Sequence, residues 1–342
     1  MLIHTNLQNI IDQAEDFPSL SGNIQKILSL AANPDTSLKE VADIIARDAS
    51  LTTRFLRMLN SAFFGLKNKI TSIHTGISLL GIQVVRDVAL TLSMLDIFPL
   101  GRSRYYTQLF ERSITTALMS DFISKMNGQP DTEDIYLAGL LQNLGMFLFV
   151  RYLPNEYFKF IEAAWRYHVE LDQLEKIHLK INHLETGLMV ARRWNLPESV
   201  QCSIAARLTG KAPAGMDAYQ NVARITFLAG MAADVYYFWN KASRIALFKE
   251  KSKELLDLTP DSAVDLLSSV PQIANDGGLA DSLQFHALPA FEQIERRAEE
   301  EIMQIHEDNI KNYKKLVMLY IKSYKLEKEL HTLRSQRAKK ES

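Results

Sequence analysis

A short run of apolar residues near the middle of the chain constrains the fold more than any other feature. Residues Ala138 to Phe149 read AGLLQNLGMFLF, in which Gln142 and Asn143 are the polar interruption. A helix that is apolar on every side finds neighbours for all of its faces only at the centre of a helical bundle. Burying an unpaired amide costs about 1–3 kcal/mol, so these two amides need hydrogen-bond partners. The run therefore predicts one central helix with a candidate polar site in its middle.

Helical periodicity continues along the rest of the chain. Apolar residues recur every three or four positions, as in helices. No stretch in which apolar and polar residues alternate, as in a β-strand, is bounded by hairpin turns. The 14 glycines and 10 prolines among 342 residues are few enough to suit long helices. We therefore expect an all-α protein. Its expected units are an N-terminal five-helix bundle (6–100), a second helical unit that contains the apolar run (101–250), a helical linker region (251–288) and a long C-terminal helix (289–342).

Two glycine-containing stretches punctuate this pattern. Gly81 is expected to separate a helix that ends at Leu80 from a very apolar helix that begins at Ile82. The Asn-Asp-Gly-Gly sequence at 275–278 is typical of a flexible joint. We hypothesise that a partner or ligand shifts the last helix about this joint, which requires different affinities for its two positions.

The long helix after Pro289 has a heptad pattern and two interpretations. One interpretation is a coiled coil that forms a homodimer, in which polar residues on the seam can fix the register. The other is an amphipathic helix that lies back on the body of its own chain. The apolar seam positions are Ile302, Ile305, Leu316, Leu319, Leu326, Leu330 and Leu333, and the polar ones are Asn309, Asn312 and Ser323.

Composition excludes several classes of partner. The 39 lysines and arginines nearly balance the 40 aspartates and glutamates, so no overall field attracts nucleic acid or anionic lipid. The basic residues near the C-terminus, from Arg334 onward, are interpreted as a solvated tail. A single cysteine, Cys202, excludes an internal disulfide and favours a reducing compartment. With neither a signal peptide nor an apolar run of about 20 residues, we expect a cytoplasmic protein that binds no nucleic acid and no membrane.

Several spaced motifs resemble one family, the HDOD domain of bacterial signalling proteins, an output domain related to the HD phosphohydrolases. The similarity covers roughly residues 16–236, and it includes the central run, which is similar to the Ala-Gly-Leu-Leu-His-Asp-Ile-Gly signature of the HD superfamily. The matching stretches are Phe17–Leu20, Asn33–Asp35, Ser37–Ala42, Ile45–Leu51, Asn60–Gly65, Ser78–Gly81, Arg112–Ala117, Ala138–Phe149, His183–Gly187 and Trp194–Glu198. The resemblance implies an HD-like helical core preceded by a further helical bundle.

The same resemblance implies a degenerate metal site. Gln142 and Asn143 replace the His-Asp pair, Arg112 stands where the first histidine is placed, and a later histidine position falls near Arg207. His183 keeps a ligand-type side chain. Neutral amides are poor ligands beside imidazole and carboxylate, and two arginines bring positive charge to the place of a cation. We expect no metal, no cofactor and no catalysis.

Three interpretations of these five positions remain. A buried hydrogen-bond network that replaces the metal is favoured, because buried polar groups are normally satisfied. Alternatively, the two arginines bind the phosphate of a nucleotide second messenger, since guanidinium groups match phosphate well. The third interpretation is a divergent metal-dependent phosphohydrolase. The resemblance implies a non-catalytic regulatory module that binds other signalling proteins.

Overall fold

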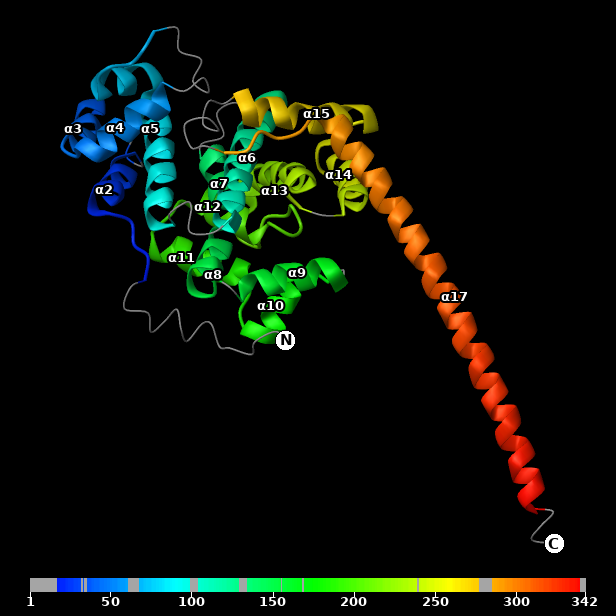
Figure 1. The fold of residues 1–342 in the computed structure, drawn as a ribbon. Coiled ribbons are helices and arrows are strands. Elements are labelled where there is room, and N and C mark those ends of the chain that lie inside the picture. The colour runs from blue at the N-terminus through cyan, green and yellow to red at the C-terminus, as the bar shows by residue number, and fades with distance from the viewer. Residues whose placement is uncertain are drawn as a thin grey trace.

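The computed structural model describes residues 17–31, 33, 36–60, 68–98, 104–128, 134–154, 156–167, 169–238, 240–276 and 285–338. Throughout these ranges the regular structure is helical and no strand occurs. The predicted all-α class is therefore confirmed. Figure 1 shows a helical body from which one long helix projects.

The N-terminal bundle stands at one side of the body, blue to cyan in Figure 1. Its buried side chains include Ile27, Val41, Ile45 and Phe55, and each contributes about 1.5–3 kcal/mol by leaving water. The helices are α2 (Gly22–Ala31), α3 (Leu38–Ala46), α4 (Ala49–Leu59) and α5 (Ile73–Ile97). Gly81 interrupts α5 with φ 80° and ψ 169°, a conformation that favours glycine, so α5 supplies the two helical segments predicted from the sequence.

The second unit forms the centre of the molecule. Its longest helix, α6, packs along both α7 and α13. The unit comprises α6 (Arg104–Met126), α7 (Ile135–Leu141), α8 (Leu144–Tyr152), α9 (Tyr157–Tyr167), α10 (Leu171–Leu179), α11 (His183–Arg193), α12 (Glu198–Ala205), a short 3-10 helix η2 (Asp217–Tyr219) and α13 (Gln220–Tyr237). Cys202 is buried in this unit as a free thiol, as a small core residue would be.

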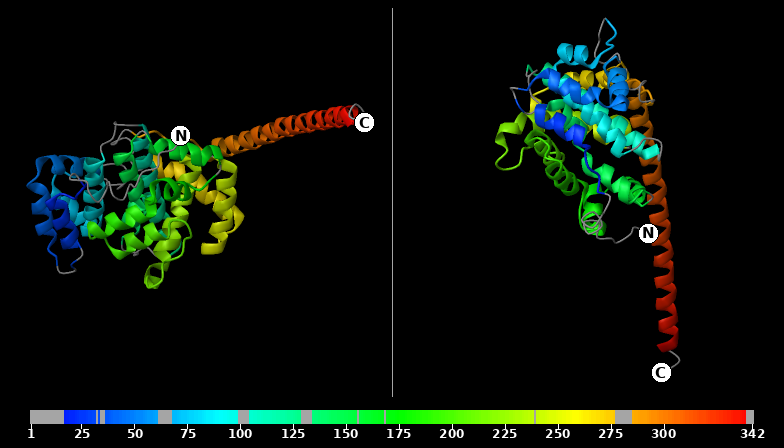
Figure 2. Two further views of the ribbon diagram at one scale, coloured as in Figure 1. Left: turned by 90° about the horizontal axis from the view of Figure 1, so that it is seen from below. Right: turned by 90° about the vertical axis from the view of Figure 1, so that its left-hand side faces the viewer.

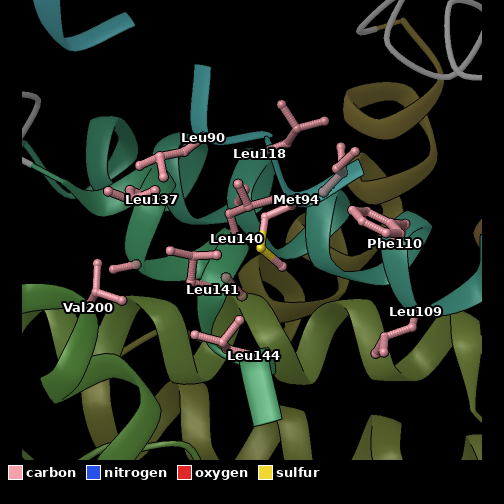
Figure 3. Packing of buried hydrophobic residues seen from close by; sticks show 14 of the residues in the cluster. Leu90, Met94, Leu109, Phe110, Leu118, Leu137, Leu140, Leu141, Leu144 and Val200 are labelled. Atoms are coloured by element: carbon pink, nitrogen blue, oxygen red, sulfur yellow. The ribbon is translucent and has the colours of Figure 1, made fainter. Parts of the chain in front are cut away.

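The prediction of one continuous central helix over residues 138–149 was wrong. The run is central and buried, but α7 ends at Leu141 and α8 begins at Leu144. Gln142 and Asn143 form the turn between them. Their amides bond to groups on other elements, and asparagine is a poor helix former because its side chain competes for backbone groups. Figure 3 shows Leu137, Leu140 and Leu141 of α7 packed near Leu90 and Met94 of α5 and Leu118 of α6.

Among the described residues, two helical stretches are long and apolar enough to cross a bilayer by length and composition alone. They are Ile73–Ile97 and Ile135–Tyr152, and the body buries 56% and 83% of their most apolar windows. The second stretch is also interrupted by Gln142 and Asn143. Both are therefore accounted for as core helices.

An ion pair joins the N-terminal bundle to the second unit. Arg86 of α5 pairs with Asp134, which precedes α7, and Ser199 of α12 donates a hydrogen bond of 2.9 Å to the other oxygen of the same carboxylate. Asp134 adopts φ 69°, a left-handed conformation that aspartate tolerates better than most residues. One carboxylate thus fixes three elements to one another.

The remaining helices are α14 (Lys241–Leu256), α15 (Pro260–Asp276) and α17 (Phe291–Ala338). The predicted boundary at residue 250 falls inside α14. Asn275, placed in the predicted joint, lies within α15, and its side chain bonds to both the N–H and the carbonyl of Leu288. Gly277 and Gly278 lie outside the described residues.

The projecting helix α17 lies on the body only at its start. Its first turns do lie on the body, where Phe291, Ile294 and Ala298 are buried. After Ile302 the side chains described are exposed, and all views show a rod that leaves the body (Figures 1 and 2). The prediction of a long C-terminal helix is confirmed, whereas its second part does not lie back on the chain.

Gly145 in α8 tests the close packing of α8 on α11. A Cβ atom there would lie 1.8 Å from the His183 carbonyl oxygen and 2.7 Å from the Gly187 nitrogen. We expect Gly145→Ala to lower the free energy of unfolding by about 3 kcal/mol or more, because the backbones must separate. Gly22→Ala is the matched control, since a Cβ there meets nothing within 4 Å. Equal unfolding free energies of the two variants in guanidinium titrations would contradict this packing.

Candidate functional site

A buried carboxylate, that of Asp234 in α13, gathers three arginines from other elements. Its Oδ1 accepts a bond of 2.5 Å from Nε of Arg112 in α6. Its Oδ2 accepts a bond of 2.6 Å from Nη2 of Arg207, which follows α12, and lies 3.6 Å from Nη1 of Arg244 in α14. We call Asp234 and these three arginines the arginine cluster. It links α13 to three neighbouring segments.

The electrostatics of the cluster keep Asp234 ionised. Burial alone would raise the pKa of Asp234, but Arg112, Arg207 and Arg244 outweigh that effect and hold the pKa well below its usual value. Burial lowers the pKa of Arg112 to about 10, although Asp234 acts in the opposite direction. Three guanidinium groups therefore face one carboxylate, which leaves excess positive charge in the cluster.

Two of the arginines also contact an aromatic ring. The guanidinium carbons of Arg112 and Arg244 lie 5.1 and 5.0 Å from the ring centroid of Phe238, which is within the range of cation–π attraction. Phe238 belongs to the aromatic segment at the end of α13. Tyr236 in that segment donates to the Leu267 carbonyl, and Tyr237 bonds to Thr115, so these aromatic residues are part of the packed core.

The amides of Gln142 and Asn143 lie at the edge of the arginine cluster. Asn143 Oδ1 accepts a bond of 3.4 Å from Nε of Arg207, and Gln142 Nε2 lies 3.5 Å from Ser203 Oγ. Three buried side-chain atoms of these site residues have no hydrogen-bond partner among the described residues: Gln142 Oε1, Asn143 Nδ2 and Arg112 Nη1. The predicted network exists in outline, but it leaves polar groups unsatisfied.

His183 belongs to a different buried group. Its Nδ1 and its backbone N–H bond to Oε2 of Glu175 at 2.7 and 2.8 Å, and Tyr157 donates to Oε1 of the same carboxylate at 2.6 Å. Glu175 has no exposed surface. The structure thus brings together Arg112, Gln142, Asn143 and Arg207 and gives His183 separate partners. Burial, followed by the charge of Glu175 and the hydrogen bond to it, raises the pKa of Tyr157.

Sequence reasoning missed Asp234 and Glu175. Asp234 is the one charged residue in the otherwise apolar stretch from Phe227 to Val235, and a lone carboxylate in such a stretch signals a buried ionic partner. Glu175 carries no comparable signal, because it lies in an amphipathic helix with several other charged residues. Only the fold places it under His183.

These donors do not fit the metal that an HD-type site implies. Guanidinium groups cannot coordinate a cation, and the two amides are weak ligands. Asp234, the one carboxylate of the arginine cluster, is occupied by the arginines. Among the described residues, no group of three histidine, cysteine, aspartate or glutamate side chains lies close enough to hold a metal ion. The positive charge of this site is supplied by the chain itself.

Asp234→Asn tests the role of the carboxylate. We expect it to lower the unfolding free energy at pH 7 by about 3–5 kcal/mol, because buried arginines lose their counter-ion. The control is Arg244→Gln, expected to cost about 1 kcal/mol or less, because Arg244 is the most exposed of the three arginines.

The pH dependence adds a second readout of the same variant. The folded-state pKa of Asp234 lies below its unfolded value of about 3.9, so its contribution is complete above about pH 4 and disappears as the pH falls through the folded-state pKa. The difference between wild type and Asp234→Asn, measured by urea titration, should therefore shrink with acidification below pH 4. A constant difference would contradict this assignment.

Comparison with known proteins identifies similar sequences and similar folds. A protein of Treponema pallidum is 28% identical over 198 residues, which are 56% of this chain and 37% of that protein. The chain thus spans well under half the length of this curated relative.

Among solved structures, an HDOD domain protein of unknown function from Geobacter sulfurreducens has a TM-score of 0.62 at 20% identity, over 78% of this chain and 96% of its own. A protein of Shewanella amazonensis, provisionally described as a phosphohydrolase, has a TM-score of 0.61 at 20% identity, over 82% and 98%. A protein of Marinobacter aquaeolei, provisionally described as a signal transduction protein, has a TM-score of 0.60 at 19% identity, and the match covers 81% of this chain and 62% of that one. These identities establish the fold. The family model of the HDOD domain matches residues 17–208, and the chain belongs to the HDOD family.

Proposed function

We propose that this chain is a non-catalytic regulatory module of bacterial signalling, which works in the cytoplasm by binding other signalling proteins. The arginine cluster carries this proposal. At the positions that resemble an HD metal site, guanidinium groups of the chain neutralise Asp234, and no ligand set for a catalytic cation is formed. The charge balance that a metal would supply is instead a permanent part of the fold.

A short physical path from the cluster to α17 supports a regulatory role. Lys241, the first residue of α14, donates from Nζ to the Tyr236 and Phe238 carbonyls at the end of α13. Its backbone N–H donates to Oε2 of Glu301 in α17 at 2.6 Å. Burial lowers the pKa of Lys241 to about 8, partly offset by Glu301. The corner that joins α13 to α14 therefore contacts both the cluster and the projecting helix.

This path gives the proposal a mechanism. Asp234 lies on α13 and Arg244 on α14, so a rearrangement of the cluster that shifts α14 would reach Glu301 through Lys241. A partner that prefers one position of α17 would then report the state of the cluster, since a partner shifts an equilibrium by its difference in affinity for the two states.

A metal-retention experiment tests the absence of catalysis. The purified chain is incubated with excess Mn²⁺, Fe²⁺ and Zn²⁺ in turn, desalted and analysed for bound metal. We expect far less than one ion per chain, because the cluster offers guanidinium groups rather than ligands. Near-stoichiometric retention would overturn the proposal and favour the divergent phosphohydrolase.

A second candidate function is an anion sensor, and the excess positive charge of the cluster favours it. Arg112 Nη1 and Asn143 Nδ2 are buried donors without partners, and guanidinium groups bind phosphate through two parallel hydrogen bonds. A phosphate group of a nucleotide would satisfy such donors. This function is compatible with the regulatory module, because the anion would be its input.

Thermal unfolding separates the two candidates. For a sensor, inorganic phosphate or a nucleoside monophosphate raises the Tm of the wild-type chain by several degrees, and Arg244→Gln reduces that shift. Chloride at equal ionic strength is the control. Equal Tm values in phosphate and chloride would exclude the sensor and leave the regulatory module that needs no small ligand.

A further inference from the structure

The part of α17 beyond the body carries an exposed apolar surface. Exposed fractions reach 67% at Leu316, 73% at Met318 and 74% at Tyr320. An exposed surface of this kind normally marks a protein contact. Its members are Ile302, Met303, Ile305, Ile310, Tyr313, Leu316, Val317, Met318, Leu319, Tyr320 and Ile321.

The densest part of this surface is the run Leu316 to Ile321, which we call the apolar band. Its six residues are consecutive and all exposed. Successive residues of an α-helix are turned by about 100°, so the band presents apolar side chains on every side of α17. Leu316 and Leu319 of the band also fall on the heptad seam, so this side of α17 is the one that a second helix would cover.

The charges on α17 change sign between Asp308 and Asn309, seven residues before the apolar band begins. From Phe291 to Asp308 the helix holds seven acidic and two basic residues, whereas from Asn309 to Ala338 it holds eight basic and two acidic residues. The helix dipole favours such an order only in the first and last turns. Asp308, Lys311 and Lys314 lie far from both ends, so the dipole does not account for them.

We propose that two copies of this chain pair through α17 in an antiparallel orientation, with the apolar bands crossing at the centre. When the two-fold axis passes between Val317 and Met318, the acidic segment from Phe291 to Asp308 of each copy lies against the end of α17 of the other copy. From residue 327 to Ala338 that end holds three basic and two acidic residues. Antiparallel pairing also places the two bodies at opposite ends of the helix pair, where they do not compete for space. The occupant of the apolar surface is therefore a second copy of the chain.

The seam positions agree with this orientation. When the two-fold axis passes between Val317 and Met318, Leu316 of each copy lies opposite Leu319 of the other. The same register places Ile302 opposite Leu333 and Asn312 opposite Ser323, so apolar residues meet apolar ones and polar residues meet polar ones. Asn309 opposite Leu326 is the mixed pair.

The pairing extends beyond the proposed function and is independent of it. It concerns a surface far along α17 from the arginine cluster. A monomeric chain would overturn the pairing and leave the non-catalytic module intact, and metal retention would have the reverse effect.

Sedimentation equilibrium on the full chain tests the pairing. We expect a dimer at micromolar concentration, and we expect Leu316→Gln with Leu319→Gln to raise its Kd at least 100-fold. The matched control is Leu79→Gln with Leu247→Gln, two leucines that are 64% and 46% exposed on α5 and α14, which should leave the Kd unchanged. Circular dichroism confirms that both variants fold. A wild-type chain that stays monomeric at 100 μM, or a band variant that dimerises like wild type, would overturn the proposal.

Spin labels determine the orientation. The label is attached at Ser335→Cys in a Cys202→Ala background. In the antiparallel pair, residue 335 lies opposite residue 300, so at 1.5 Å per residue the two labels are about 50 Å apart. A parallel pair would bring them within about 20 Å. The short distance would contradict the proposed orientation, and the long one supports it.

Discussion

The arrangement of the central helices depends on one ionised carboxylate. Asp234 has little exposed surface, and it stays charged because three guanidinium groups surround it. Removing it would leave the positive charges of α6, α14 and the segment after α12 without compensation. Because Arg112 of α6 is buried, this is far more costly than losing a surface ion pair. The cluster therefore holds α13 in register with its neighbours, a task that a bound cation would otherwise perform.

This arrangement changes what the HD-like core is able to do. In a metal site, the cation is exchangeable and a bound water supplies the reactive group. In the arginine cluster, the positive charges are covalently part of the chain and cannot activate water in that way. The same geometry keeps positive charge next to the turn formed by Gln142 and Asn143. This site therefore holds fixed positive charge in place of ligands for a cation.

Sequence reasoning predicted what depends on local pattern. The helices, the interruption at Gly81 and the long helix after Pro289 follow from periodicity and from residues with special backbone preferences. The break between α7 and α8 was not predicted, because it depends on partners such as Ser203 and Arg207 that are about 60 residues away. The pairing of His183 with Glu175 was missed for a similar reason. The sequence pointed to Arg112, Gln142, Asn143 and Arg207, which the fold brings together, whereas the ionic partner Asp234 required the fold.

The contact of α17 with the body is confined to its first turns, so a small tilt at that contact produces a large displacement of the far end of the helix. The 36 residues from Met303 to Ala338 extend for about 54 Å at 1.5 Å per residue. A tilt of about 10° at Glu301 would then displace the far end by roughly 9 Å, by the same helical rise. Adjustments too small to repack the core of α13 and α14 are thereby amplified into movements as large as the width of a helix.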